Sequence, residues 1–413
     1  MTAPSPSAGI RRGTPAYRRA NLAFFLSAFV TFASLYSVQP LLPIFAAEFG
    51  LGAGESSLSL SATTAVLAAA LILASWVSDR VGRRRLMVWS IPATALLGLA
   101  LPLSPGWASL VAIRAAMGLT LSGLPAVAMV YLAEEMEPPA LGFSMGLYIG
   151  GTAIGGMAGR LVSGVLADWI GWRPALLVLG TAIAIAALAV VILLPQARNS
   201  SSQRMGLGRL GQLIAVQFTD RGLPWLFVSA FLLMGSFVTL YNYAGFRLAL
   251  PPFELSHAAI SSIFVVYLLG SVSSAWAGGL SQRLGRRRVY WAMVLVMAVG
   301  IALTALPCTV GVIAGLAVAT IGYFAAHGIA SAWVARRAQK GRAQASAMYM
   351  FAYYLGSSVL GTLGGYAWTA WQWPGVLLVS GSAIVVALAI ALGLTRLPVL
   401  PLPEQPPEPP GPA

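Results

Sequence analysis

Long apolar runs alternate with short polar segments along almost the whole chain. About 20 consecutive apolar residues form a helix long enough to cross the hydrocarbon core of a bilayer. Six such runs precede residue 195 and six follow residue 223, so the pattern predicts an all-α integral membrane protein. The predicted transmembrane helices are 21–43, 56–77, 86–104, 107–132, 141–166, 173–194, 224–247, 257–280, 288–306, 310–334, 343–367 and 375–395.

Three polar segments separate or flank these runs. The first is basic, the second carries several arginines and is expected to form a surface helix, and the third is rich in proline. The predicted organisation is a cytoplasmic tail at 1–19, a six-helix bundle at 20–194, a cytoplasmic linker at 195–223, a second six-helix bundle at 224–396 and a cytoplasmic tail at 397–413.

A short basic turn occurs twice, at equivalent places in the two halves. Residues 75–85 read SWVSDRVGRRR, and residues 278–288 read GGLSQRLGRRR. Gly82 and Gly285 allow a tight backbone turn, and the arginines remain in water at one membrane face. The repetition predicts an internal duplication, with two six-helix bundles related by a pseudo-twofold axis.

Composition agrees with a membrane protein, because 58% of the residues are hydrophobic and only 9% are charged. A net charge of +14 could suit nucleic acid, but the arginines lie at the ends of apolar runs, so the expected partner is the lipid bilayer and no nucleic acid. Of the 25 Lys and Arg residues, 21 fall on one side of the predicted membrane. By the positive-inside rule, both termini are expected in the cytoplasm.

Several chemistries are disfavoured by the residues that the chain lacks. The one cysteine, Cys308, cannot form an intramolecular disulfide, and two histidines give little material for a metal site, so no metal or cofactor is expected. No Asp or Glu lies inside a predicted span, which argues against a membrane-embedded enzyme. The duplicated turn fits a moving two-part machine better than a fixed receptor. There is no P-loop motif, so ATP does not drive the protein directly.

With these features in view, the chain resembles the major facilitator superfamily over roughly residues 18–397. The turn between helices 2 and 3 is similar to the family signature in Asp79, Arg80, Gly82, Arg83 and Arg84, although Ser75 replaces its first glycine. The second copy keeps Arg283, Gly285 and Arg286 but has Gln282 in place of the aspartate.

Other segments extend the resemblance. Arg114 and Gly118 are similar to the helix-4 motif of the family, and residues 168–173 (DWIGWR) also resemble its members. Helix 5 resembles a motif associated with antiporters, without its proline, through four glycines that we expect to serve helix packing: Gly151, Gly155, Gly156 and Gly159. Residues 36–43 and 143–173 resemble YnfM-type bacterial efflux permeases.

The resemblance implies a monomeric secondary transporter in the bacterial inner membrane that alternates access to a central cavity. It implies efflux of a small organic molecule in exchange for protons, with uptake by symport or uniport as the alternative. It also implies that Asp79 caps the start of helix 11, near residues 343–346, when the cavity is closed to the cytoplasm. The alternative partner for Asp79 is an arginine in its own turn. Glu134, Glu135 and Glu137 are expected to pair with Arg83–Arg85.

Three basic side chains lie inside predicted spans more than one helical turn from the span ends. Arg114 lies about 10 Å inside helix 4, which suits a solute pathway; the alternative is a structural arginine bonded to backbone carbonyls. His327 could carry a proton, because the ordinary pKa of histidine is near neutrality; the alternative is a neutral histidine packed between helices. Arg160 is expected to extend to the nearby membrane surface.

Aromatic and amide side chains complete the predicted pathway, and about half of them are expected to face the cavity. They are Tyr36, Gln39, Tyr148, Tyr241, Asn242, Tyr323, Tyr349 and Tyr353. A cavity that offers Arg114 and no acid favours a neutral or anionic solute. Glu48, Glu55 and Glu254 are alternative sources of negative charge at the span ends.

Overall fold

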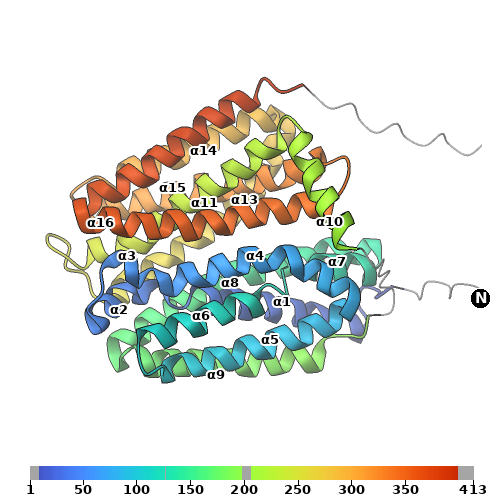
Figure 1. Cartoon of the computed structure of the whole chain (residues 1–413), viewed down its shortest axis with the longest axis horizontal. Coiled ribbons are helices and arrows are strands. Elements are labelled where there is room, and N and C mark those ends of the chain that lie inside the picture. The colour runs from blue at the N-terminus through green and yellow to red at the C-terminus, as the bar shows by residue number, and fades with distance from the viewer. Residues whose placement is uncertain (1–8, 126, 198–205, 399–413) are drawn as a thin grey trace, which may run out of the picture.

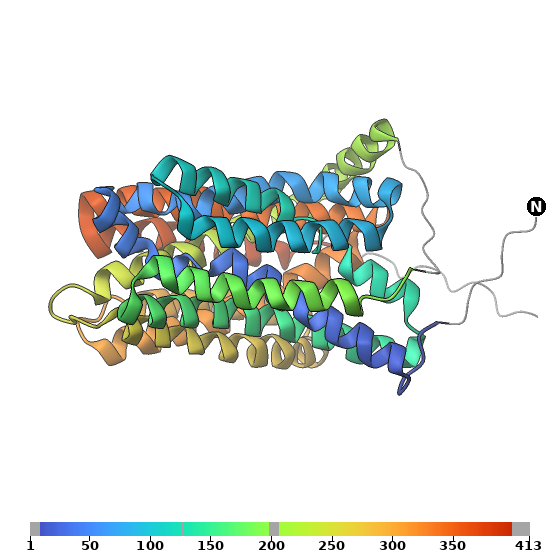
Figure 2. The same ribbon diagram turned by 90° about the horizontal axis from the view of Figure 1, so that it is seen from below.

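The computed structural model describes residues 9–125, 127–197 and 206–398, and over these residues the chain forms helices and turns with no β-strand. Most helices run side by side along the long axis of the molecule (Figures 1 and 2). They form two halves, one from the N-terminal part of the chain and one from the C-terminal part (Figure 1). The predicted all-α membrane fold is confirmed.

The N-terminal half contains the first six predicted spans, some of which are broken into two helices. Its elements are α1 (Pro15–Tyr36), η1 (Gln39–Leu41), α2 (Leu42–Phe49), α3 (Ala53–Ser56), α4 (Leu58–Val81), α5 (Arg83–Ala100), η2 (Leu101–Leu103), α6 (Trp107–Leu121), α7 (Ala128–Glu135), α8 (Pro138–Ile170) and α9 (Trp172–Leu193). Proline lies at the first or second position of η1, α2, η2 and α8, where its missing N–H group needs no helical partner.

The linker forms short helices, and the C-terminal half contains the other six predicted spans. Their elements are α10 (Leu207–Ala215), η3 (Val216–Thr219), α11 (Leu223–Leu248), α12 (His257–Ser262), η4 (Ile263–Val266), α13 (Tyr267–Leu284), α14 (Arg286–Leu303), α15 (Thr309–Arg337) and α16 (Arg342–Leu394). The 53-residue α16 contains both predicted spans 343–367 and 375–395. Its path changes direction at Gln372, which has φ 52°, just before Pro374.

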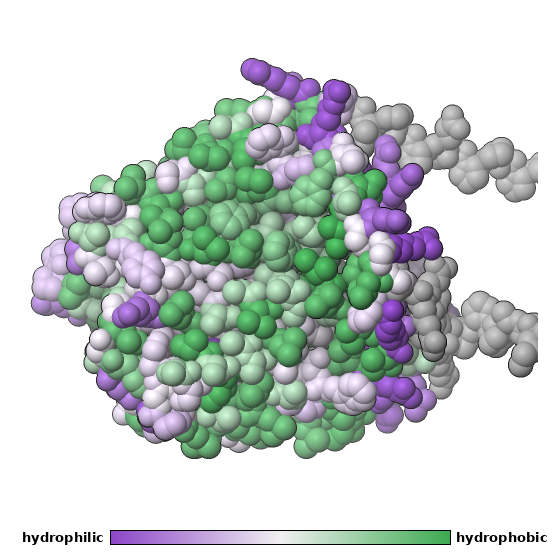
Figure 3. All heavy atoms as spheres, viewed as in Figure 1, coloured by the Kyte–Doolittle hydropathy of each residue, from purple (hydrophilic) through white to green (hydrophobic). Residues whose placement is uncertain are grey.

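Eight of the described helical segments are long and apolar enough to cross a membrane. One of them, α16, contains two of the predicted spans. Leu58–Ala74 and Trp107–Leu121 are shorter apolar helices. On the face shown in Figure 3, apolar side chains predominate between the two ends, and hydrophilic side chains lie at both ends, with the most hydrophilic ones gathered at the right-hand end. We call the right-hand end the basic end, because the helices α5 and α14 begin there with Arg83 and Arg286, and the opposite end, with α2 and α3, the far end (Figure 1).

The two basic turns have almost the same backbone conformation. Gly82 has φ 95° and ψ 138°, and Gly285 has φ 87° and ψ 131°. Each glycine ends one helix, and the next helix begins at the following residue. A positive φ disfavours any residue with a Cβ atom, so glycine is needed at both positions.

The glycines of α8 allow that helix to approach α1 closely. A Cβ atom on Gly155 would lie 2.6 Å from Phe29 Cα, and one on Gly159 would lie 2.7 Å from Ala33 Cα. Gly151 lies in the same way against the Phe25 carbonyl of α1. Gly118 of α6 similarly lies against the backbone of α4. Small residues at such positions let helix backbones pack closely in a membrane.

Candidate functional site

The two halves meet through α4 and α16 toward the far end. Ser358 Oγ donates a hydrogen bond to the Ser61 carbonyl at 2.8 Å, and Thr362 Oγ1 donates to Ser61 Oγ at 2.8 Å. Gly54 and Gly365 lie directly against each other nearby. These contacts occur near the start of α4, which runs from the far end to the Gly82 turn at the basic end. The far end is therefore tightly closed.

A second contact between the halves is a chain of three polar side chains, which we call the amide bridge. Gln39 Nε2 donates a hydrogen bond to Asn242 Oδ1 of α11 at 2.7 Å. Arg160 Nε of α8 donates to Gln39 Oε1 at 2.5 Å, and another nitrogen of its guanidinium donates to the Gly156 carbonyl at 2.7 Å. All three side chains are buried.

Aromatic rings from both halves surround the guanidinium of Arg160. Its central carbon lies 3.8 Å from the ring centre of Tyr36, 4.4 Å from that of Tyr267 and 5.3 Å from that of Phe264. Such rings attract a cation through their negative faces. The expectation that Arg160 extends to the membrane surface is wrong, because only 2% of the residue is exposed. Its helix continues for ten residues beyond it, to Ile170, so the surface is out of reach.

Arg114 is fully buried inside the N-terminal half. Its guanidinium donates hydrogen bonds to the carbonyls of Ser59 at 2.6 Å, Ser34 at 2.9 Å and Leu35 at 2.6 Å. These carbonyls belong to α1 and α4, so the side chain ties two helices to α6. This geometry is that of the structural arginine held as the alternative, and it gives no support to a solute pathway through Arg114.

His327 lies in a cluster of tyrosines between α15 and α16. His327 Nδ1 is 3.0 Å from the Tyr349 hydroxyl, and the ring centres of His327 and Tyr353 are 4.8 Å apart. Tyr323 donates a hydrogen bond to the Tyr353 hydroxyl at 2.8 Å. The Tyr36 hydroxyl interacts with both Tyr353 and Arg160, so the cluster is continuous with the amide bridge.

Most of the aromatic residues predicted for the pathway therefore belong to one connected group. Tyr241 belongs to it as well, because its ring centre is 5.0 Å from that of Tyr267. Tyr148 instead packs beside Phe24 of α1, with ring centres 6.4 Å apart. Sequence reasoning missed Tyr267 and Phe264. The sequence feature that could have identified them is their spacing, because two aromatic residues three apart share one face of a helix in the eighth predicted span.

The basic end carries an ion-pair network around Arg83. Two nitrogens of Arg83 donate to the two carboxylate oxygens of Glu134, each at 2.7 Å, and a third nitrogen contacts Asp79 at 3.4 Å. The predicted pairing of Glu134 is confirmed, whereas Glu137 pairs with Arg11 of the N-terminal tail. Burial raises the pKa of the Asp79 carboxyl even though Arg83 acts in the opposite direction. In this conformation, Asp79 has the partner in its own turn that was held as the alternative.

Among the residues that the structure describes, the equivalent turn in the C-terminal half forms no ion pair. Gln282 and Arg283 are exposed, and Arg286 lies 5.8 Å from the ring centre of Trp333. The linker is attached nearby through Asp220, whose carboxylate accepts hydrogen bonds from Arg337 at 2.5 Å and from the backbone N–H of Leu223 at 2.8 Å. Burial opposes ionisation of Asp220, but these hydrogen bonds prevail and lower its pKa.

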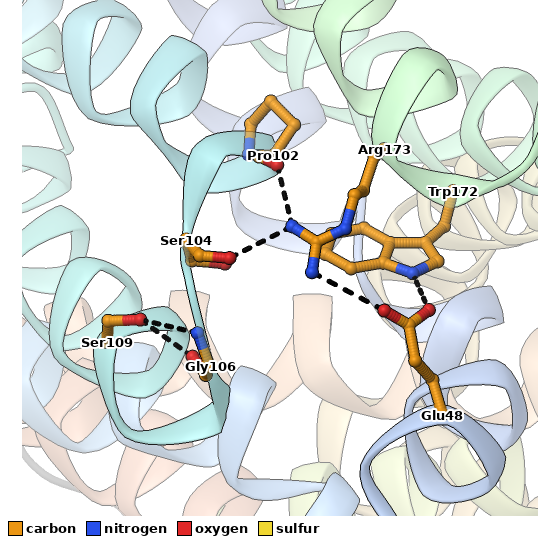
Figure 4. A network of polar contacts seen from close by, with 7 residues as sticks. All are labelled: Glu48, Pro102, Ser104, Gly106, Ser109, Trp172 and Arg173. Carbon is orange, nitrogen blue, oxygen red and sulfur yellow. Dashed lines mark hydrogen bonds and ion pairs between the residues drawn. The ribbon is translucent and has the colours of Figure 1, made fainter.

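The DWIGWR segment organises the far end (Figure 4). Trp172 Nε1 donates to the Glu48 carboxylate, and Arg173 donates to the carbonyls of Pro102 and Ser104, each at 2.9 Å. Figure 4 shows these groups meeting where α2, α9 and the turn before α6 come together. Glu48 is thus engaged in the N-terminal half and does not supply charge to the site.

The other two acids named for the far end also lie outside the site. Glu55 accepts a hydrogen bond from the Gly52 backbone N–H at 2.9 Å. Glu254 is exposed to solvent.

Two helical halves that meet around a buried polar group are the arrangement expected of a membrane transporter. The sequence model of the family described as the Major Facilitator Superfamily matches residues 24–253 and 232–413. The chain belongs to this family. It is a multi-pass transporter of small solutes and not an enzyme.

The chain is similar to curated transporters over nearly its whole length. It is 42% identical to the inner membrane transport protein YnfM of Escherichia coli K12, covering 95% of this chain and 94% of that protein. It is 41% identical to the uncharacterized MFS-type transporter YybF of Bacillus subtilis 168, covering 94% and 96%.

Solved structures share the fold. A mutant of the nucleoside transporter NupG superposes with a TM-score of 0.74 at 15% identity, covering 91% of this chain and 100% of that one. A bacterial homolog of the human lysosomal transporter Spinster, in an inward-facing and unoccupied conformation, gives a TM-score of 0.71 at 14% identity, covering 93% and 95%.

Proposed function

We propose that the protein is a monomeric secondary carrier that exports a small organic solute across the bacterial inner membrane in exchange for protons. The observation that carries the proposal is the amide bridge, in which Arg160, Gln39 and Asn242 join the two halves within the membrane. A contact made by a few side-chain hydrogen bonds can break and re-form, as alternating access between two halves requires.

Charge gives the proposed orientation. With 21 of 25 Lys and Arg residues on one side, the positive-inside rule places the basic end in the cytoplasm. The far end then faces the periplasm, where contacts such as Ser358 with Ser61 close the carrier. In the opposite state these contacts separate, and Asp79 moves from Arg83 to the start of α16.

Proton coupling is assigned to His327. Its ring nitrogen shares a hydrogen bond with Tyr349, so gain of a proton changes which of the two groups donates. The hydroxyls of Tyr323 and Tyr353 lie beside it and continue toward Tyr36 and the amide bridge. A change of protonation at His327 can thereby alter the contacts that join the halves.

The test combines a solute search with reconstituted flux. The cellular levels of metabolites and added drugs are first compared between cells with and without the protein. Any solute whose level is lower in cells with the protein is then tested for transport in proteoliposomes with an imposed pH gradient. The expected result is that the solute and the protons cross the membrane in opposite directions, with proton movement reported by a pH dye inside the liposomes. Movement in the same direction as protons would replace export with symport, and flux indifferent to pH would replace it with uniport. Protein-free liposomes are the control.

A further inference from the structure

Arg160 is a buried cation without a carboxylate partner in the described part of the chain. Among residues 9–125, 127–197 and 206–398, none of the ion pairs includes Arg160, although only 2% of the residue is exposed. A buried guanidinium without an opposite charge is costly unless other groups replace its water. Gln39 Oε1, the Gly156 carbonyl and the three rings do this here.

Arg114 shows what a purely structural arginine looks like in the same chain. Its acceptors are backbone carbonyls of α1 and α4, all within the N-terminal half, so they stay with it when the halves separate. Arg160 differs on two counts. One of its acceptors is the side chain of Gln39, which can rotate away, and two of its rings, Tyr267 and Phe264, belong to the other half. The surroundings of Arg160 must therefore change during the transport cycle.

Two further hydrogen-bond donors near Arg160 have no acceptor among the described residues. The Tyr267 hydroxyl and Asn242 Nδ2 are buried and without a partner in the part of the chain that the structure describes. Tyr267 packs its ring on Arg160, and Asn242 is bonded to Gln39 through its oxygen. A buried donor without an acceptor is unfavourable by about 1–3 kcal/mol. The site thus has an excess of positive charge and of donors.

We propose that Arg160 binds the carboxylate of an anionic solute, and that the Gln39 amide oxygen occupies this position in the empty carrier. A carboxylate accepts two parallel hydrogen bonds from a guanidinium, so it can replace the single bond to Gln39. The rings of Tyr36, Tyr267 and Phe264 favour a solute whose carboxylate is attached to an aromatic or other flat apolar group. This inference rests on the proposed carrier function and assigns its solute class.

Binding at Arg160 also provides a route to the conformational change. Because Gln39 bonds Arg160 and Asn242 at the same time, a solute that displaces Gln39 from Arg160 also disturbs the bond to Asn242. That bond joins the two halves toward the far end. The solute therefore favours separation of the far end, which a carrier requires of its substrate.

The test measures binding by thermal unfolding of the purified full-length protein in detergent. The probes are aromatic carboxylates, each paired with its neutral amide, such as benzoate with benzamide and phenylacetate with phenylacetamide; sodium sulfate reports any general salt effect. The expected result is a higher unfolding temperature with a carboxylate than with its amide. Arg160→Gln should abolish this difference, and Arg160→Lys should keep part of it. Arg247→Gln is the matched control, because Arg247 also lies beside aromatic rings, Phe253 and Trp373, but within the C-terminal half.

Gln39→Ala separates a binding role from a structural one. Removing the amide oxygen removes the competitor for Arg160, so the variant should bind the carboxylate several-fold more tightly even if it is less stable. An equal response to carboxylate and amide in the native protein would overturn the inference, and so would an unchanged response in Arg160→Gln. If Arg160→Gln does not fold, Arg160→Lys and Gln39→Ala decide the question. Carboxylate binding without flux in liposomes would instead count against the carrier function alone.

Discussion

The carboxylate of Asp168 accepts a hydrogen bond from the backbone N–H of Ala258 at 3.2 Å. Asp168 lies near the end of α8 in the N-terminal half, and Ala258 lies in the first turn of the helical segment His257–Leu284 in the C-terminal half. A carboxylate is attracted to the partial positive charge at a helix start. This contact at the far end is the counterpart of the one proposed for Asp79 at the basic end.

Asp168→Asn should weaken closure of the far end. Loss of the negative charge removes about 0.3–1 kcal/mol of attraction to the helix start, which shifts the balance between the two states by about two- to five-fold. Spin labels at the exposed positions Ala47 and Leu250, after replacement of Cys308, would report the width of the far end. The matched control is Glu254→Gln, which alters an exposed acid at the same end. Identical distance distributions for Asp168→Asn and the native protein would contradict the prediction.

Asp79→Asn should have the opposite effect, enlarging the population that is open at the basic end and slowing transport. Because burial raises the pKa of Asp79, this carboxyl takes up a proton at a higher pH than an ordinary aspartate. The negative charge is present above that pKa and is lost as the pH falls through it. Native protein should therefore approach the behaviour of Asp79→Asn on acidification, while the variant changes less. Label distances across the basic end, recorded over a pH series, check this; parallel pH responses would refute it.

His327→Gln tests the coupling step separately from transport. The amide can still form a hydrogen bond with Tyr349 but cannot carry a proton between pH 5 and 8. Gradient-driven accumulation should be lost, while exchange of labelled for unlabelled solute across the membrane continues. Normal pH-dependent accumulation by the variant would leave His327 as a neutral residue packed between helices.

Arg114→Ala should lower stability without altering the charge preference for solutes. It removes hydrogen bonds to three carbonyls, and a hydrogen bond to a charged group contributes about 1.5–3 kcal/mol. We expect a clear fall in unfolding temperature and an unchanged ratio of carboxylate to amide binding. A selective loss of carboxylate binding in Arg114→Ala would restore the solute pathway that the sequence suggested.

Gly155→Val should destabilise the contact between α8 and α1. Even a Cβ atom at Gly155 would lie 2.6 Å from Phe29 Cα, and such overpacking costs about 1–3 kcal/mol. Gly146→Val is the matched control on the same helix, because a Cβ atom there meets nothing within 4 Å. The unfolding temperature should fall for the first variant and change little for the second. Equal effects would show that helix packing does not explain the glycine.

The fold was predictable because each membrane span is encoded locally, as an apolar run long enough to cross the bilayer. Positions of single side chains were not, because their partners come from other helices. Arg114 finds carbonyls of α1 and α4, which no pattern within α6 can reveal. The predicted span that contains Arg160 ends at 166, whereas α8 continues to Ile170, so Arg160 lies deeper than the sequence indicates. The tyrosine group around His327 was anticipated in part, because polar aromatic residues are unusual inside apolar helices.

The amide bridge determines how much binding free energy a solute must supply to change the conformation of the carrier. Reversing a 99 to 1 preference between two states takes about 5.5 kcal/mol of differential binding. One charged hydrogen bond contributes about 1.5–3 kcal/mol, so the two bonds of a carboxylate to Arg160 cover much of that difference. Gln39, by already bonding Arg160, subtracts from the gain. A solute must therefore bind Arg160 more strongly than the neutral amide of Gln39 does, and solutes that bind no better than an amide are not transported.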